Sequence, residues 1–192
     1  MSQQRQLDEL RRQMIEQNIC PGLAAQATQL VMGDGNPDAD IVLIGEAPGK
    51  SEDEQGIPFV GASGRFLNEM LAAAELGRED IYITNIVKYR PPNNRDPMPN
   101  EKALFWPYLI RQLEIINPKV IITLGQHSGE AFMPGLQISK DHGKAQKVHF
   151  RDHEYLVVAL YHPAASLYNG SLRPVLIEDF VATVGMVREL LT

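Results

Sequence analysis

The sequence predicts an α/β fold in which helices cover both faces of a parallel sheet. Four short apolar runs alternate with segments of helical periodicity, which is the pattern of repeated β–α–β units. The runs are apolar throughout, as is typical of strands buried on both faces. With 192 residues, of which 44% are hydrophobic, the chain suits one compact domain over residues 1–192.

The elements follow in a regular order. Strands are expected at Ile41–Ile44, Asp80–Val87, Lys119–Leu124 and Glu154–Tyr161. Helices are expected at Leu7–Asn18, Arg65–Ala74, Asn100–Ile116, Gln126–Phe132 and Leu172–Leu191. Asn100 is the expected N-cap of its helix, and Pro107 introduces a kink there. Residues 139–147 are polar and predict a mobile loop, after which Val148–Phe150 forms a hairpin with the last strand.

Charge and cysteine content exclude several classes of protein. The 24 acidic and 18 basic residues give a net charge of −6, which argues against non-specific coating of nucleic acid but permits a local basic face. Cys20 is the only cysteine, so an internal disulfide and a four-cysteine metal or iron–sulfur site are excluded. The first residues lack an apolar signal core, and no apolar run approaches about 18 residues. We therefore expect a soluble, cytoplasmic protein that does not contact a membrane.

The stretch Asp40–Leu67 is the first candidate for a functional site. Its apolar strand breaks into the turn Gly45–Gly49, and the segment carries a carboxylate, an aromatic ring and five glycines. Ligands of open α/β sheets bind just outside the carboxyl ends of the strands. A loop of this composition at a strand end is therefore expected to line a binding site.

Polar side chains from three strands are expected to meet at that edge. Glu46, Asn85 and His162 lie at or just past the ends of three different strands. Asn85 offers a donor and an acceptor side by side, which matches the carbonyl and ring N–H of a pyrimidine edge. Phe59 can stack on a flat ring, and His162 can donate to an oxygen that gains negative charge. Glu46 can orient water or stabilise developing positive charge. Together these residues suit a pocket of the size of a nucleobase.

Each of these residues also has a structural explanation. A carboxylate in a strand-end turn often caps backbone groups, a Phe between Pro and Val is often part of the core, and an Asn can satisfy its own loop. The Gly61–Gly64 segment before a helix suits a phosphate, and equally suits an ordinary glycine-rich helix entry. His149 and His153 flank the expected hairpin turn, so their spacing does not predict a metal site.

Several segments resemble the uracil-DNA glycosylase superfamily, and most closely its family 4. They are GDGNPDADI (Gly33–Ile41), GEAPGKSEDEQGIPFVGASGRFL (Gly45–Leu67), ITNIVKYRPPNNRDP (Ile83–Pro97), PKVIITLG (Pro118–Gly125) and YHPAASL (Tyr161–Leu167). The resemblance covers nearly the whole chain from Cys20 onward. It implies a three-layer α/β/α sandwich with a central four-stranded parallel sheet. It also implies hydrolysis of the N-glycosidic bond of uracil in DNA, by a monomer that leaves an abasic site.

The resemblance assigns a role to each candidate residue. Phe59 would stack on the flipped uracil, Asn85 would bind its edge, and the backbone around Ala47 and the side chain of His162 would face O2. Glu46 would act at the sugar or at water. Ser166 and Leu167 would enter the duplex, with Leu167 as the wedge. Lys88, Arg90, Arg95 and Arg173 surround the expected mouth and would bind phosphates.

The chain departs from the family 4 pattern at the iron–sulfur cluster. Family 4 proteins hold a [4Fe–4S] cluster with four cysteines, whose positions here carry Gln17, Cys20, Tyr89 and Phe105. We therefore expect no cluster, no other cofactor and no metal, with aromatic packing in its space. As in family 4, Ala47 stands where better-known uracil glycosylases carry an aspartate base. A protein that binds nucleic acid or a free base without cleavage, and a glycosylase for another deaminated base, remain the alternatives.

Overall fold

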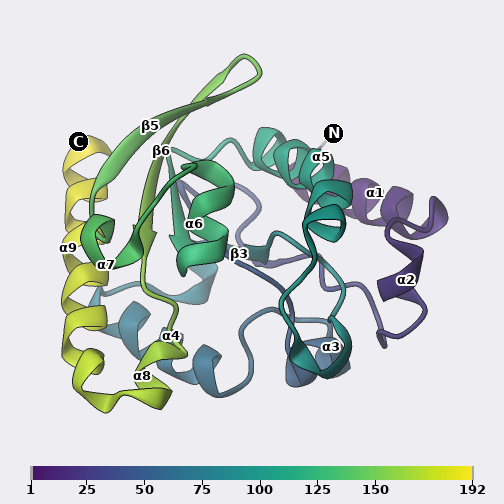
Figure 1. The fold of residues 1–192 in the computed structure, drawn as a ribbon. Coiled ribbons are helices and arrows are strands. Elements are labelled where there is room, and N and C mark those ends of the chain that lie inside the picture. Colours follow the sequence, from purple (N-terminus) through teal and green to yellow (C-terminus); the bar gives the residue numbers. More distant parts are fainter. Residues whose placement is uncertain (1, 192) are drawn as a thin grey trace.

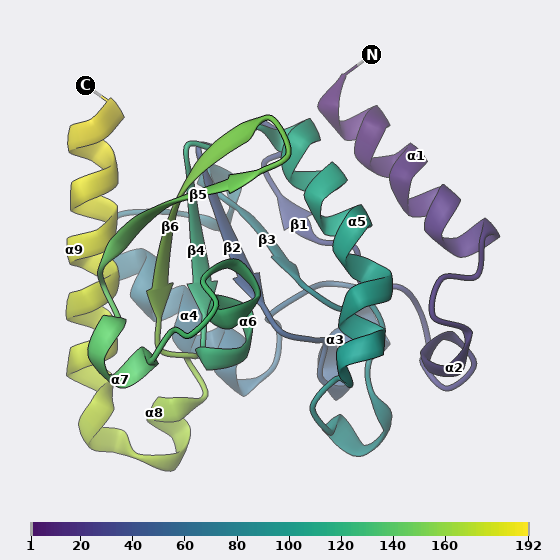
Figure 2. The same cartoon turned by 45° about the horizontal axis from the view of Figure 1, so that its top comes forward.

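The computed structural model describes residues 2–191, and its centre is one twisted sheet (Figures 1 and 2). In the described part of the chain the sheet has six strands in the order β1-β3-β2-β4-β6-β5. The strands are β1 (Asp34–Gly35), β2 (Ile41–Gly45), β3 (Tyr82–Asn85), β4 (Val120–Leu124), β5 (Ala145–Phe150) and β6 (His153–Leu160).

Four of these strands are parallel, as the sequence predicts. β2 pairs in parallel with β3 and β4, and β4 pairs in parallel with β6. The whole sheet has six strands, because β1 and β5 add an antiparallel strand to each edge of the predicted four; the pairing of β5 with β6 confirms the expected hairpin at Val148–Phe150. Both edge strands are largely exposed or half-buried, so they lack the continuous apolar run that marks the central strands.

Helices cover both faces of the sheet and make three layers. The helices are α1 (Gln3–Glu16), α2 (Pro21–Ala24), α3 (Lys50–Gln55), α4 (Ala62–Ala73), α5 (Pro99–Ile116), α6 (Gln126–Phe132), α7 (Ile138–Asp141), α8 (Ala165–Tyr168) and α9 (Arg173–Leu191), with 3₁₀ turns at Arg78–Asp80, Pro92–Asn94 and Gly170–Leu172. One core packs α1, α5 and α6 against one face, and a second core packs α4 and α9 against the other (Figure 2). Successive residues of β2 point to opposite faces: Val42 and Ile44 enter the first core, and Ile41 and Leu43 enter the second. Both faces of β2 are therefore buried, which explains why it is apolar throughout.

Local details differ from the sequence-based expectations. α5 begins at Pro99 rather than after Asn100, and Glu101 accepts from the backbone N–H of Met98 at 2.7 Å. The expected loop at residues 139–147 instead contains the end of α7 and the start of β5. The pairing of β5 with β6 supplies the hydrogen bonds of that polar segment, which its composition does not reveal.

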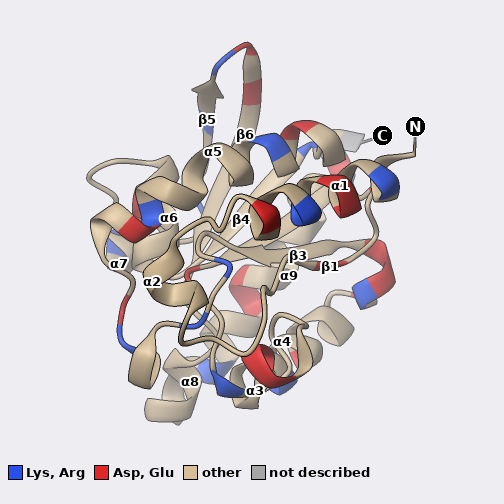
Figure 3. Ribbon diagram, turned by 90° about the vertical axis from the view of Figure 1, so that its right-hand side faces the viewer, with Lys and Arg blue, Asp and Glu red and all other residues tan. Residues whose placement is uncertain are grey.

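Charged residues are interspersed over the surface. Figure 3 shows acidic and basic residues alternating along α1, where Arg12 pairs with both Glu9 and Glu16. No helix within residues 2–191 is long and apolar enough to cross a membrane.

Candidate active site

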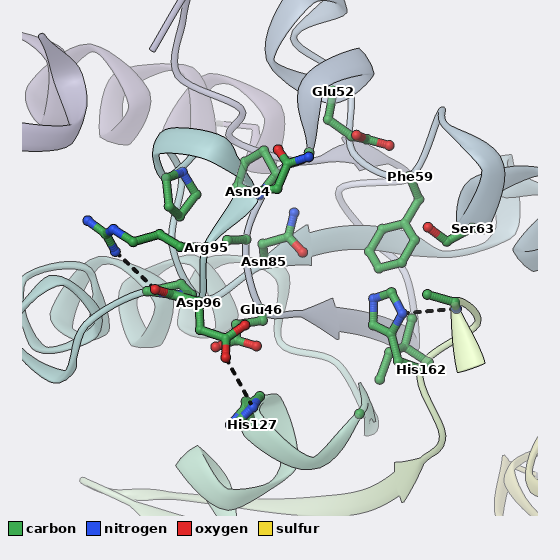
Figure 4. A pocket seen from close by; sticks show the side chains of 18 of the residues that line it. Glu46, Glu52, Phe59, Ser63, Asn85, Asn94, Arg95, Asp96, His127 and His162 are labelled. Carbon is green, nitrogen blue, oxygen red and sulfur yellow. Dashed lines mark hydrogen bonds and ion pairs between the residues drawn. The ribbon is translucent and has the colours of Figure 1, made fainter. Parts of the chain in front are cut away.

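A cavity of about 530 Å³ opens at the carboxyl ends of the parallel strands. Each of the four parallel strands contributes a lining residue at or just past its end: Glu46 after β2, Asn85 from β3, Leu124 from β4 and His162 after β6. Figure 4 shows the side chains of Phe59, Asn85 and His162 around one space, with Glu46 beside it. The side chains that the sequence placed at one sheet edge therefore line one cavity.

Gly45 lies against Asn85 and Phe59, two of the residues that line the cavity. A Cβ atom at this position would lie 2.4 Å from Asn85 Oδ1 and 2.7 Å from Phe59 Cζ. Asn85 is 2% exposed, so its amide is buried except where it faces the cavity. The missing side chain of Gly45 thus lets the aromatic ring and the amide approach each other closely.

Phe59 is held in a backbone conformation that bulky residues rarely adopt. Its φ is 54°, and such outliers cluster at functional sites where the surroundings fix them. Arg78 donates to the carbonyl of Phe59 at 2.9 Å and to that of Pro58 at 2.6 Å. Glu52 accepts from the next two backbone N–H groups, those of Val60 and Gly61. These contacts fix the ring at the wall of the cavity, 5.7 Å from the His162 ring between centroids.

His162 is a neutral hydrogen-bond donor. Burial lowers its pKa from 6.5 to about 4, against a small opposing effect of the Glu52 charge. Its Nδ1 accepts from the backbone N–H of Ala164 at 3.1 Å. A neutral imidazole that accepts at Nδ1 carries its hydrogen on Nε2. The ring therefore presents an N–H group without carrying a charge.

Glu46 is part of a group of paired charges. Lys102 Nζ lies 2.8 Å from Glu46 Oε1, as an ion pair whose angles do not meet those of a hydrogen bond. Glu46, Asp96 and His127 also place ligand atoms within 4.8 Å of one another. Lys102 thus supplies a positive charge to Glu46 within this group. Its arrangement holds a carboxylate at the side of the cavity away from Phe59 (Figure 4).

A short turn beside the cavity carries two exposed large hydrophobic side chains. α8 follows His162 directly, and Leu167 and Tyr168 on it are 50% and 91% exposed. Ser166 is buried, and its hydroxyl donates to the carbonyl of Pro163 at 2.9 Å. Ala47 lines the inner wall of the same cavity.

The expectation that Lys88 binds phosphate at the mouth of the site is wrong. The residue is 0% exposed, and its Nζ lies 2.6 Å from Thr84 Oγ1, 2.7 Å from the Asn85 carbonyl oxygen and 2.6 Å from Gln112 Oε1. Burial lowers the pKa of Lys88 well below its usual value. Lys88 therefore ties the end of β3 to α5 and does not reach a phosphate from this position.

The other three basic residues lie nearer the surface but have partners. Arg95 lines the cavity and makes two hydrogen bonds to the buried carboxylate of Glu101, at 2.9 and 2.7 Å. Arg173 pairs with Glu69 and lies 4.5 Å over the Phe66 ring. Arg90 donates from Nε to Asn94 Oδ1 at 2.7 Å, so its guanidinium has a neutral partner.

Some lining residues escaped sequence reasoning. Among them are Glu52, Ser63, Asn94, Asp96, His127 and Tyr168. Glu52 lies in an acidic segment whose composition is typical of a solvated surface. No local pattern connects it to the backbone around Phe59. Its position within the stretch Gly45–Leu67 was the only available signal.

The residues at the expected cluster positions form a packed group. Cys20, Tyr89 and Phe105 are buried in one core, and the rings of Tyr89 and Phe105 meet edge to face at 6.0 Å between centroids. Gln17 lies at its border, where its Oε1 accepts from the Tyr108 hydroxyl at 2.7 Å. Burial raises the pKa of the Cys20 thiol. The donor set contains one thiol, so it does not match the four thiolates of a [4Fe–4S] cluster.

The fold and the site together define a class of protein. They describe an α/β protein with a pocket at the carboxyl edge of a parallel sheet, lined by an aromatic ring, an amide, an imidazole and a carboxylate. Comparison with known families agrees, because residues 32–184 match the uracil DNA glycosylase superfamily. The chain belongs to this superfamily.

Its relatives include Type-4 uracil-DNA glycosylases. The chain is 48% identical over 162 residues to the one of Sulfurisphaera tokodaii, covering 80% of this chain and 72% of that protein. It is 45% identical over 179 residues to the one of Archaeoglobus fulgidus, covering 91% and 89%. The protein of Thermotoga maritima is 40% identical over 172 residues, covering 88% of each chain.

Proposed function

We propose that this protein is a DNA repair glycosylase that hydrolyses the N-glycosidic bond of uracil in DNA and leaves an abasic site. The observation that carries the proposal is the cavity in which Phe59, Asn85, His162 and Glu46 meet. The Type-4 names of its relatives support the same activity. We also infer that the chain acts as one domain and as a monomer. We infer that it is cytoplasmic, which fits its single cysteine.

Recognition of the base begins with its extrusion from the stack. Swinging a nucleotide out of DNA costs a few kcal/mol, which contacts within the pocket must offset. The Phe59 ring supplies a stacking surface, and the Asn85 amide supplies a donor and an acceptor for one edge of the pyrimidine. Gly45 keeps both groups close enough to contact the same ring.

Catalysis then stabilises charge at both ends of the breaking bond. Uracil leaves as an anion, so the Nε2–H of His162 and a backbone N–H near Ala47 stabilise the negative charge that develops at O2. The sugar gains positive charge, which the carboxylate of Glu46 stabilises while it orients water. Because Ala47 carries no carboxylate, the mechanism relies on stabilising these charges more than on a strong base.

Contacts with the DNA strand surround the mouth of the cavity. Leu167 is half exposed on α8 and suits a wedge that fills the space left by the base, with Ser166 fixing the turn from inside. Arg90, Arg95 and Arg173 are our candidates for phosphate contacts, and the neutral partner of Arg90 leaves its charge uncompensated. Lys88 is withdrawn from this set because it is buried.

We further infer that the protein works without an iron–sulfur cluster. Cys20 is its only cysteine, and Tyr89 and Phe105 fill the core beside it. Aromatic packing would then join the segment around Cys20 to the Arg90–Pro97 loop. In family 4 a cluster would connect these two segments.

The test is the release of free uracil from a single-stranded oligonucleotide that contains one uracil. We expect release by the wild-type protein and a large loss in His162→Ala, because removing one comparable donor costs about 100- to 1000-fold in rate in other enzymes. The double variant Glu46→Ala, His162→Ala is the background control. Wild-type release no faster than that of the double variant, with DNA affinity intact, would instead show a binding protein.

A further inference from the structure

Tyr168 is the most exposed large hydrophobic side chain in the described part of the chain. Its 91% exposure contrasts with the burial of most aromatic side chains, because an exposed ring gains little packing energy. Leu167 beside it is 50% exposed, so two large side chains stand next to each other in solvent. Tyr168 is one of the residues that line the cavity, and Leu167 precedes it on α8.

The backbone under Tyr168 is well anchored. The backbone N–H of Asn169 donates to the Ala165 carbonyl at 3.0 Å, and that of Leu167 donates to the Ala164 carbonyl at 3.0 Å. On the far side, Asn169 Oδ1 accepts from the backbone N–H of Ser171 at 3.1 Å and from its hydroxyl at 2.7 Å. The ring is therefore presented to solvent from a fixed turn, which lowers the entropy cost of using it in binding.

We propose that Tyr168 is a stacking platform for the base of a nucleotide adjacent to the extruded uracil. Extrusion leaves the neighbouring bases with an exposed ring face, and every base offers such a face regardless of sequence. An aromatic side chain that continues the lining of the uracil cavity is suitably placed to cover it. The inference rests on the proposed function, because the adjacent nucleotide is defined by the uracil in the cavity.

The chemistry of the turn favours a base over a phosphate. Between His162 and Leu172 the chain contains no Lys or Arg, and Arg173, our candidate for a phosphate contact, lies beyond the turn at the start of α9. A phosphate would find no free cation on this turn, whereas a base would find an aromatic and an aliphatic side chain.

The same turn also carries the hydrogen bonds of His162. The backbone N–H of Ala164 donates to His162 Nδ1, and that of Ala165 donates to its carbonyl at 2.9 Å. A base that stacks on Tyr168 therefore contacts the segment that orients His162, the proposed hydrogen-bond donor to O2. Tyr168 is a positioning and binding residue in this scheme, without contact to the reacting atoms.

The experiment measures binding of single-stranded oligonucleotides that carry a non-cleavable 2′-fluoroarabino analogue of deoxyuridine. We expect Tyr168→Ala to raise Kd by about 5- to 150-fold, the range that corresponds to about 1–3 kcal/mol per stacked base. Tyr168→Phe and Tyr168→Trp retain the affinity because they keep the ring. Leu190→Ala is the matched control, since Leu190 is 62% exposed near the end of α9 and does not line the cavity.

A second set of oligonucleotides identifies the base. An abasic spacer replaces the nucleotide on the 5′ side of the uracil analogue in one and on the 3′ side in the other. We expect one spacer to weaken wild-type binding as much as Tyr168→Ala does, and the variant to lose little more with that spacer. The inference is overturned if Tyr168→Ala weakens binding by the same factor with both spacers as with the intact oligonucleotide. It is also overturned if the variant binds the intact oligonucleotide as tightly as the wild type. Uracil release by the wild type tests the proposed function separately.

Discussion

His162 shows how one side chain acquires its chemistry from its immediate contacts. Its ring is mostly enclosed, and its Nδ1 is occupied by the N–H of Ala164. A charged imidazole would have to donate from both nitrogens, which this contact does not allow. The neighbouring backbone therefore selects the neutral ring with the hydrogen on Nε2.

This assignment predicts a specific NMR result. We expect the His162 ring to remain the neutral Nε2–H form at pH 7 and to titrate near pH 4, as its lowered pKa of about 4 implies. ¹⁵N spectra of the ring measure both properties, and His162→Gln identifies the signal by its loss. A signal that titrates near the ordinary value of 6.5 would contradict the assignment.

The same pKa has a defined effect on stability. Because the pKa is 6.5 in the unfolded reference and about 4 in the fold, the unfolded chain takes up the proton first as the pH falls. The contribution of His162 to the free energy of unfolding is therefore complete above about pH 6.5 and decreases as the pH falls toward 4. Urea titrations of the wild type and His162→Gln should differ in slope against pH within this interval.

At the scale of elements, the buried network around Lys88 joins β3 to α5 behind the site. Its Nζ has three oxygen acceptors, and Gln112 in turn donates to the Met32 carbonyl at 3.0 Å and to the Tyr82 hydroxyl at 3.1 Å. One of the three acceptors is the carbonyl of Asn85, the residue proposed to bind the uracil edge. The network therefore fixes the strand end that presents this amide.

We expect Lys88→Met to lower the free energy of unfolding by about 1–3 kcal/mol, because it leaves buried oxygens without a donor. Urea unfolding measures this loss. In the variant that remains folded, KM for a uracil-containing oligonucleotide should rise because the end of β3 is less firmly held. The control is Lys119→Met, which removes a half-exposed lysine paired with Asp40 and should cost less than about 0.5 kcal/mol. Equal unfolding midpoints for the two variants would contradict this role.

At the scale of the whole molecule, two cores lie on opposite faces of the sheet, and the cavity of the site opens at the carboxyl ends of the strands between them. The core on the side of α1 and α5 includes Cys20, Tyr89 and Phe105. Apolar packing thus occupies the region in which the family 4 pattern places a cluster. We therefore expect the fold there to depend on burial of side chains rather than on metal–thiolate bonds.

This packing predicts a protein without iron. We expect the purified chain to be colourless, with no absorbance band near about 400 nm and no stoichiometric iron, because a [4Fe–4S] cluster needs more thiolates than Cys20 provides. Exposure to a chelator should leave the melting temperature unchanged. Bound iron in a fixed ratio to protein would refute the prediction.

The sequence by itself determined the parallel strands and the residues at their ends. Each central strand is a local apolar run, and the carboxyl ends of parallel strands share one edge. The sequence alone therefore predicts that Glu46, Asn85 and His162 lie close together. Only the tertiary structure decided the direction of Lys88 and the partner of Glu46. These depend on which side of a loop faces the core and on residues that are distant in the chain, such as Gln112 and Lys102, and no local pattern encodes either.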